Sequence, residues 1–166
     1  MKMADQNSAA IRVLVVEDNT ADADLVRITL EEHAPGDFTV AHVRKLSSAL
    51  EQMARHAYDV VLLDLGLPDA DGLETLERFR KARPSTPVVV LTGRSDRTVG
   101  LAALERGAHA YVLKGGDHPD ELVGCIRGAL GRRRAMEDLA AVTSTLRSAE
   151  ARLKRIHPTE PRAKKP

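Results

Sequence analysis

Five short apolar runs recur along the first two thirds of the chain, and their pattern predicts the strands of a sheet. The runs are Ile11–Val16, Phe38–Val43, Asp59–Leu63, Pro87–Leu91 and His109–Leu113. The first, third and fourth are nearly continuous in Val, Leu and Ile, which is typical of strands covered on both faces of a parallel sheet. The second alternates more between apolar and polar residues, which places it nearer an edge of the sheet.

Segments with helical periodicity separate these runs. They are Ala21–Glu32, Ser48–Arg55, Asp71–Ala82 and Arg97–Arg106. Ser48 and Glu51 have the spacing of a capping box, and Asp71 and Glu74 have the related spacing, so these two helices are expected to begin at Ser48 and Asp71. Pro119 marks the start of a fifth helix, because proline favours the first helical position.

Five strands that alternate with five helices predict an α/β fold, the flavodoxin-like (βα)5 doubly wound parallel sheet. Ligands bind in such folds beyond the carboxyl ends of the strands. The polar side chains expected at those ends are Glu17, Asp18, Asp64, Thr92 and Lys114.

Three carboxylates, one hydroxyl and one ammonium group therefore meet at one edge of the predicted sheet. Two carboxylates about 4 Å apart repel each other by about 4 kcal/mol at an effective dielectric constant near 20. A hard divalent cation relieves this repulsion, and Mg²⁺ fits a site with few carboxylates and several waters. With this cation and an ammonium group in place, one carboxylate can attack the phosphorus of a donor and form an acyl phosphate.

These residues carry a resemblance to a known family. Glu17-Asp18, Asp64, Thr92, Tyr111 and Lys114 occur in the order found in the receiver domain of bacterial two-component response regulators, the CheY-like family. The stretch from Leu63 to Glu74, LDLGLPDADGLE, strongly resembles the phosphorylation-site segment of that family, and the resemblance covers roughly 12–130.

The resemblance implies a role for each matched residue. Asp64 is the expected phosphoacceptor, and Lys114 and Thr92 are the expected partners of the phosphoryl oxygens. Thr92 and Tyr111 form the expected switch, in which Tyr111 turns inward as Thr92 moves. The expected Mg²⁺ ligands are Glu17, directly or through water, Asp18, Asp64 and the backbone carbonyl of Gly66.

Two positions depart from the commonest pattern of the family. Lys114 is usually followed by proline, but here Gly115-Gly116 follows, which makes the turn after the lysine more flexible. Position 66 holds glycine where a bulkier side chain is frequent. A small residue there leaves the phosphoryl group more open to water, so we expect rapid self-dephosphorylation.

The chain continues beyond the receiver segment with a heptad pattern. Leucine, valine, alanine and isoleucine recur with spacings of three and four at 139, 142, 146, 149, 153 and 156. This seam predicts a helical extension over 131–157 that forms a coiled coil and a homodimer, although a helix folded back on its own domain would show a similar stripe. Pro158 is expected to end the helix, and 1–10 and 158–166 are expected to be disordered.

Composition narrows the partners and the compartment. The chain has two Phe, two Tyr and no Trp, which argues against a nucleic-acid stacking surface. The net charge of the chain is +1, but the charge is uneven: the residues after 130 include ten Lys or Arg and four Asp or Glu. This basic excess fits a solvated helix or contact with an acidic partner. A single cysteine, Cys125, and the absence of an apolar run long enough for a membrane span predict a cytoplasmic protein.

We therefore expect a response regulator that a partner histidine kinase phosphorylates on Asp64 and that switches partner binding, through the face of the fourth helix, fifth strand and fifth helix, or dimerisation. It is not expected to be an enzyme beyond promoting its own phosphorylation and dephosphorylation, and no DNA-binding output domain is expected. Alternatives are a phosphorelay intermediate and a receiver with linker from a larger signalling protein. A pseudo-receiver that only dimerises and an Mg²⁺-dependent phosphatase are less favoured, because the acid set is intact and Gly66 stands where the phosphatase needs an acid.

Overall fold

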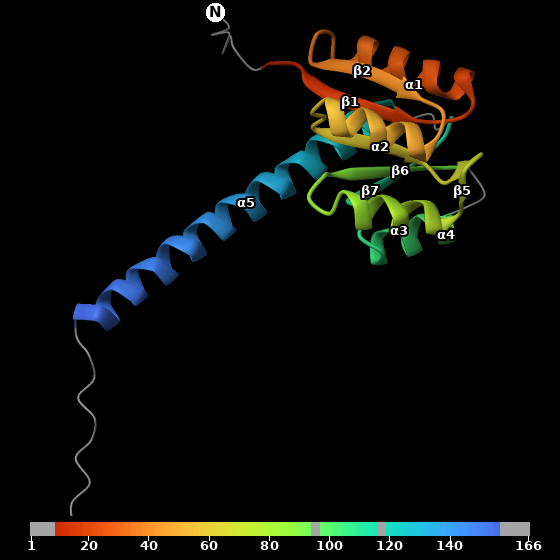
Figure 1. Cartoon of the computed structure of the whole chain (residues 1–166). Coiled ribbons are helices and arrows are strands. Elements are labelled where there is room, and N and C mark those ends of the chain that lie inside the picture. The colour runs from red at the N-terminus through yellow and green to blue at the C-terminus, as the bar shows by residue number, and fades with distance from the viewer. Residues whose placement is uncertain (1–8, 94–96, 116–118, 157–166) are drawn as a thin grey trace, which may run out of the picture. The chain divides into compact units, whose positions relative to one another are not determined.

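A five-stranded parallel sheet organises the receiver segment. The computed structural model describes residues 9–93, 97–115 and 119–156. The sheet strands are β1 (Ile11–Val16), β2 (Phe38–Val43), β3 (Val60–Asp64), β6 (Val88–Thr92) and β7 (Ala110–Leu113). Their order is β2-β1-β3-β6-β7, with parallel pairing throughout (Figure 1). This is the flavodoxin-like order, so the predicted fold is confirmed, and β2 lies at an edge as its pattern indicated.

Helices cover both faces of the sheet. They are α1 (Thr20–His33), α2 (Leu46–Arg55), α3 (Leu73–Ala82), α4 (Arg97–Glu105) and α5 (Pro119–Ile156). Helices α2, α3 and α4 pack on one face, where Leu46, Phe79 and Ala103 are fully buried against alternate strand residues (Figure 1). Helix α1 and the first turns of α5 pack on the other face, where Leu30 and Ile126 are buried.

The central strands are buried completely, which explains their continuous apolar sequences. Every residue of β3 and of β6 is buried, including Asp64 and Thr92, the last residue of each strand. Side chains of successive strand residues point to opposite faces, so both faces need apolar residues when helices cover both. The strands thus deliver two polar side chains to one edge of an otherwise apolar sheet.

Two helix starts differ from the prediction. Helix α2 begins at Leu46 and not at Ser48, and its first amides, on Leu46 and Ser47, each donate a 2.9 Å hydrogen bond to the carboxylate of Asp69. These bonds make the Asp69 pKa lower than usual, although burial alone would raise it. The capping box at Ser48 is therefore wrong, because a carboxylate from a distant loop satisfies the helix start instead.

Helix α3 begins at Leu73 and not at Asp71. Asp71 belongs to β5 (Ala70–Asp71), which pairs antiparallel with β4 (Gly66–Leu67) in a small hairpin between β3 and α3. Gly72 precedes the helix at φ +59°, a left-handed conformation that favours glycine, and gives it no side-chain cap. The predicted cap at Asp71 is wrong for this reason, and the hairpin was not predicted.

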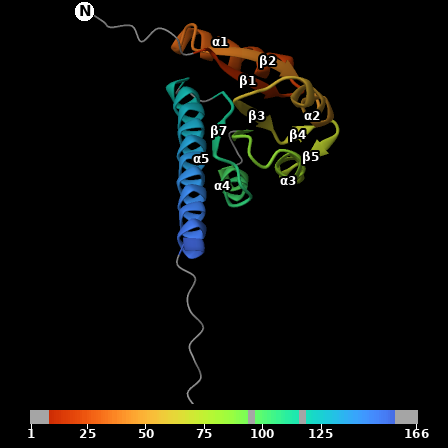
Figure 2. The same ribbon diagram turned by 60° about the vertical axis from the view of Figure 1, so that its left-hand side comes forward.

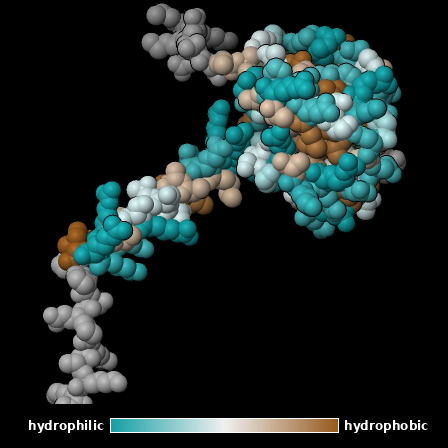
Figure 3. Space-filling model, in the orientation of Figure 1, coloured by the Kyte–Doolittle hydropathy of each residue, from teal (hydrophilic) through white to brown (hydrophobic). Residues whose placement is uncertain are grey.

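Helix α5 is a single helix that starts at Pro119, as predicted, and continues to Ile156. The chain divides into two compact units, 1–131 and 132–166. In the second unit, large apolar residues are exposed, among them Leu139, Val142, Leu146 and Leu153, each at least 57% exposed. Figure 3 shows apolar residues interspersed with hydrophilic ones along this part of the helix.

The predicted stop at Pro158 and the predicted disorder at 1–8 and 158–166 lie outside the described residues. Among the residues that are described, no helix has the length and apolar character of a membrane span. The cytoplasmic location stays a prediction.

Candidate functional site

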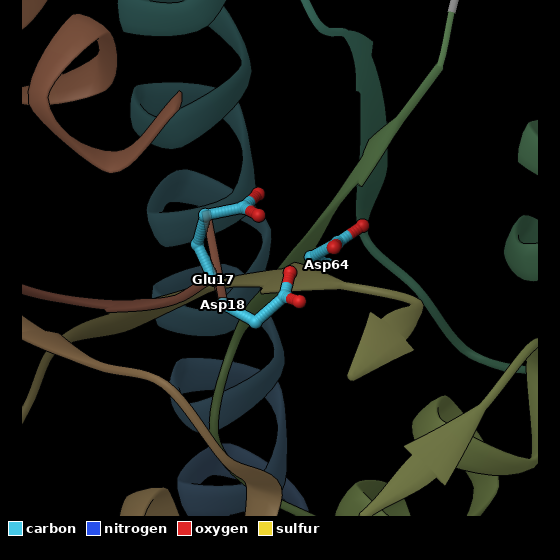
Figure 4. A group of neighbouring side chains, drawn as sticks. All are labelled: Glu17, Asp18 and Asp64. Carbon is cyan, nitrogen blue, oxygen red and sulfur yellow. The ribbon is translucent and has the colours of Figure 1, made fainter. Parts of the chain in front are cut away.

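Three carboxylates meet where β1 and β3 end. Glu17 and Asp18 follow β1, and Asp64 ends β3; one carboxylate oxygen from each lies within 4.8 Å of the others (Figure 4). Glu17 is fully buried and Asp64 is 8% exposed. The strand pairing explains this meeting, because Val16 and Leu63 are partners in the parallel ladder. The carboxyl ends of β1 and β3 therefore lie side by side.

Side chains from β2 and the loop after it hold the backbone that presents these acids. A ring nitrogen of His42, Nε2, lies 2.7 Å from the carbonyl oxygen of Glu17, and Nε of Arg44 donates to the carbonyl of Asp18 at 3.0 Å. The backbone amide of Asn19 donates to the Glu17 carboxylate at 3.1 Å. These bonds fix the turn between β1 and α1.

Lys114 brings a positive charge into this group of acids. Its Nζ lies 2.6 Å from Oε2 of Glu17, 3.2 Å from Oδ2 of Asp64 and 3.4 Å from Oδ2 of Asp22. Sequence reasoning missed Asp22, which lies in the first turn of α1. Asp22 lies four residues after Asp18, and this spacing was a usable signal. Because α1 starts beside the acid cluster, a side chain in its first turn can point back towards that cluster.

The surroundings of Glu17 and Lys114 raise the pKa of both side chains. Burial raises the pKa of Glu17 above its usual value, and the charge of Asp64 adds to this, while the bonds from Lys114 and Asn19 oppose it. Burial alone would lower the pKa of Lys114, but its contacts with Glu17 and Asp64 outweigh burial and raise that pKa. Lys114 is therefore a firmly protonated cation inside an anionic site.

Thr92 ends β6 next to Lys114. The backbone amide of Lys114 donates to the carbonyl oxygen of Thr92 at 2.7 Å, so the two predicted phosphoryl partners are joined through the backbone. Thr92 is 4% exposed, and its Oγ1 is buried without a hydrogen-bond partner among the described residues. An unpaired buried hydroxyl is costly, and a ligand oxygen beside it would remove that cost.

Tyr111 lies apart from the acids, on β7 against α4. Its ring packs over Gly100, so closely that a Cβ at position 100 would be 2.5 Å from the ring carbon Cδ2. Figure 2 shows α4 beside β7. The ring contacts the core on the α4 face of the sheet, so a change in its position would reach the surface of that helix.

A cavity of about 280 Å³ opens beside Asp64. Its lining includes Gly66, Gly72, Thr92 and Gly93. A Cβ added at Gly66 would lie 3.8 Å from Oδ2 of Asp64, in ordinary contact. The cavity leaves Asp64 open to an approaching ligand, and glycine at position 66 adds no side chain that would narrow this opening.

The donor set fits a hard divalent cation. Glu17, Asp18 and Asp64 supply only carboxylate oxygens, which Mg²⁺ prefers, and Mg²⁺ keeps waters as its remaining ligands. Gly66 lines the same cavity as Asp64, and a Cβ at position 66 would be 3.8 Å from Oδ2 of Asp64. The structure therefore brings together all of the predicted metal residues, along with Lys114 and Thr92, and places Tyr111 one step away on the neighbouring strand.

A doubly wound sheet with an acid cluster, a lysine and a threonine at its carboxyl edge is typical of the receiver class of α/β domains. The model of the response regulator receiver domain family matches residues 13–127. The chain belongs to the response regulator receiver domain family.

Known proteins similar to the chain are consistent with this family. The transcriptional activator protein IrlR of Burkholderia pseudomallei is 39% identical over 127 residues, covering 76% of this chain and 53% of IrlR. The transcriptional regulatory protein TrcR of Mycobacterium tuberculosis is 38% identical over 135 residues, 79% of this chain and 49% of TrcR. A CheY-like receiver domain structure from Methanospirillum hungatei has a TM-score of 0.64 at 28% identity and covers 76% of this chain and 98% of that one.

The chain spans about half the length of the curated relatives it matches. The match lies in the receiver segment, whereas the exposed part of α5 lies beyond residue 127. The relatives thus support a receiver domain in this chain and say nothing of what α5 does beyond residue 127.

Proposed function

We propose that the chain is a two-component response regulator that a sensor histidine kinase phosphorylates on Asp64. The observation that supports this most directly is the contact of Lys114 with both Glu17 and Asp64, next to the unpaired hydroxyl of Thr92. A phosphoryl group on Asp64 would give both Lys114 and Thr92 an acceptor oxygen. Among the three clustered carboxylates, Asp64 is the one that lines the cavity.

The proposed reaction is a phosphoryl transfer between two proteins. A carboxylate oxygen of Asp64 forms a bond to phosphorus while the bond from phosphorus to the kinase histidine nitrogen breaks, and that nitrogen keeps the electron pair. A divalent cation held by Glu17, Asp18, Asp64 and the Gly66 carbonyl would neutralise charge on the transferring oxygens. Lys114 would pair with the same oxygens through its ammonium group. Water later attacks phosphorus and restores the Asp64 carboxylate, so the chain promotes only its own phosphorylation and dephosphorylation.

The proposed switch follows from the added charge. An acyl phosphate brings about −1.5 to −2 charges and three acceptor oxygens. Thr92 would turn its hydroxyl towards these oxygens, and Tyr111 would move into the space beside it, which shifts a two-state equilibrium. Leu101 and Leu104 on α4 are 55% and 39% exposed, and they offer an apolar surface on the face of α4, β7 and α5 for a downstream protein.

The experiment that tests the phosphoacceptor is intact-protein mass spectrometry with acetyl phosphate and Mg²⁺. Wild type is expected to gain one phosphoryl mass, and Asp64→Asn none. Asp71→Asn is the matched control, because Asp71 lines the same cavity outside the acid cluster. If wild type gains no mass and binds no beryllofluoride, or if Asp64→Asn gains the same mass, the proposed function is wrong.

The proposed output of the tail is homodimerisation through a coiled coil. Leu139, Leu146 and Leu153 are exposed at a seven-residue spacing, and a partner helix would cover them. Ala149 lies on this seam, whereas Ala151 lies off it. Ala149→Lys is therefore expected to dissociate the dimer and Ala151→Lys to leave it intact, as measured by light scattering during gel filtration. Equal masses for the two variants would contradict this interface.

Measuring the dimer with and without acetyl phosphate tests whether the tail responds to phosphorylation of Asp64. A dimer that tightens or loosens with acetyl phosphate would make the tail a readout of Asp64. A dimer that ignores phosphorylation would make it a constant tether, as expected for a receiver with linker from a larger protein. This second role stays an alternative, because the chain spans about half the length of the transcriptional regulators it resembles.

A further inference from the structure

Lys114 uses three different carboxylates, and only two of them belong to the cation site. An ammonium group has three N–H donors. Glu17 and Asp64 accept from the lysine at 2.6 and 3.2 Å and are also members of the acid group that fits a divalent cation. Asp22, at 3.4 Å, lies outside that acid group. Among the described residues, it is the one carboxylate partner of the lysine outside the acid group.

Local structure fixes Asp22 at this position. Helix α1 starts with Asn19 as its cap, and the Asn19 side-chain oxygen accepts from the amides of Ala21 and Asp22 at 2.9 and 3.4 Å. The backbone of Asp22 is therefore held at the first turn of the helix. Its side chain is 39% exposed and reaches the lysine from the rim of the cluster.

The residue that follows Lys114 adds no side chain that could hold the lysine in place. The Lys114 amide is bonded to the Thr92 carbonyl, but Gly115 follows in the left-handed region at φ +63°. Glycine populates this region freely and adds no side chain that could restrain the lysine. The carboxylates around Nζ therefore have to define where the ammonium group lies.

We propose that Asp22 is a positioning residue that keeps the Lys114 ammonium group at the rim of the cluster while Glu17 and Asp64 turn to a divalent cation. The proposal rests on the proposed function, because it assumes that this cluster binds the cation used in phosphorylation. Without Asp22, the ammonium group keeps only the oxygens that the cation needs. Two positive charges then compete for the same two carboxylates, so cation binding weakens.

The test is titration calorimetry of the full chain with Mg²⁺ alone. Asp22→Asn is compared with Asp24→Asn, which removes the same charge two residues further along α1, where Asp24 pairs with Arg27 at 3.5 Å. Exposed ion pairs contribute little, so we expect Asp22→Asn to bind Mg²⁺ about two- to fivefold more weakly than Asp24→Asn. Asp22→Glu, which restores the carboxylate, is expected to recover affinity.

A double-mutant cycle separates action through the lysine from a plain charge effect. Lys114→Met is expected to bind Mg²⁺ more tightly, because the competing ammonium group is gone. In that background, Asp22→Asn is expected to weaken binding no more than Asp24→Asn does. The inference is overturned if Asp22→Asn equals Asp24→Asn in the wild-type background, or if its extra effect persists in full without the lysine.

The outcome for the proposed function is read separately from wild type. If wild type binds Mg²⁺ and gains a phosphoryl mass while Asp22→Asn behaves as Asp24→Asn, only the role of Asp22 is refuted. If wild type binds no Mg²⁺, both the role of Asp22 and the proposed chemistry of the cluster are refuted.

Discussion

Adding one methyl group at Gly100 is expected to disturb the contact between α4 and Tyr111. The new Cβ would lie 2.5, 2.7 and 2.8 Å from three carbons of the Tyr111 ring, whereas ordinary contacts begin at 3.4 Å. The ring or the helix must therefore move by about 0.9 Å to restore an ordinary contact. Overpacking of this kind costs about 1–3 kcal/mol of unfolding free energy.

The helix itself gains from the same change. Alanine is more favourable than glycine inside a helix by about 0.8–1 kcal/mol, so Gly100→Ala should destabilise the receiver by a net 0–2 kcal/mol or so. Gly124 of α5 is the matched control, because a Cβ there would meet nothing within 4 Å. Gly124→Ala should stabilise the protein by about 1 kcal/mol.

Urea unfolding followed by circular dichroism measures both variants. The two are expected to differ by about 1–3 kcal/mol, which is the cost of the clash. In a Tyr111→Ala background, the difference should disappear. Tyrosine fluorescence in a Tyr58→Phe background should also change with Gly100→Ala, because Tyr111 is then the only tyrosine in a chain without tryptophan. Equal stabilisation by Gly100→Ala and Gly124→Ala would refute the close packing of Tyr111 on Gly100.

Two further predictions concern the loops around the site. Asp69→Ala should lower the unfolding free energy by about 1 kcal/mol, because it removes the cap of α2, while Ser48→Ala should change it little. The pKa of Asp69 is lower in the folded protein than in the unfolded chain, so the Asp69 carboxylate stabilises the fold above its usual pKa of about 3.9. The stability difference between wild type and Asp69→Ala should therefore vanish as pH falls through the pKa that Asp69 has in the folded protein. Gly66→Met should lengthen the acyl-phosphate lifetime severalfold, because its side chain would lie against Asp64 and exclude water. An unchanged rate of phosphoryl loss would rule this out.

Local pattern predicted the sheet and most of the site. β3 and β6 are buried on both faces, so their continuous apolar sequences predict that they are central strands. Parallel strands end at the same edge of the sheet, so Asp18, Asp64 and Lys114 are expected there independently of the loop conformations. The match of Thr92 and Tyr111 to the family order needed no structure either. The strands and their common edge followed from periodicities of a few residues and from the switch-point rule, whereas the roles of Thr92 and Tyr111 followed from the family resemblance.

Long-range contacts between loops were beyond the reach of such patterns. The cap of α2 is Asp69, 23 positions after Leu46, and a local capping box at Ser48 looked equally suitable. The hairpin of β4 and β5 has two residues in each strand, too few for any alternation to show. Asp22 approaches Lys114 across 92 positions of sequence, and its place in the first turn of the helix after Asp18 was the one local signal that could have singled it out.

The burial of β3 and β6 divides the site into two halves that should exchange amide hydrogens on different timescales. Asp64 and Thr92 end strands whose amides are shielded on both faces, so they should open only when the whole receiver unfolds. Lys114 follows β7, an edge strand with one buried residue, Val112, and precedes Gly115. The proposed phosphoacceptor Asp64 is thus expected to lie in the slowest-exchanging part of the sheet, whereas the Lys114 ammonium group can shift without moving the Asp64 carboxylate.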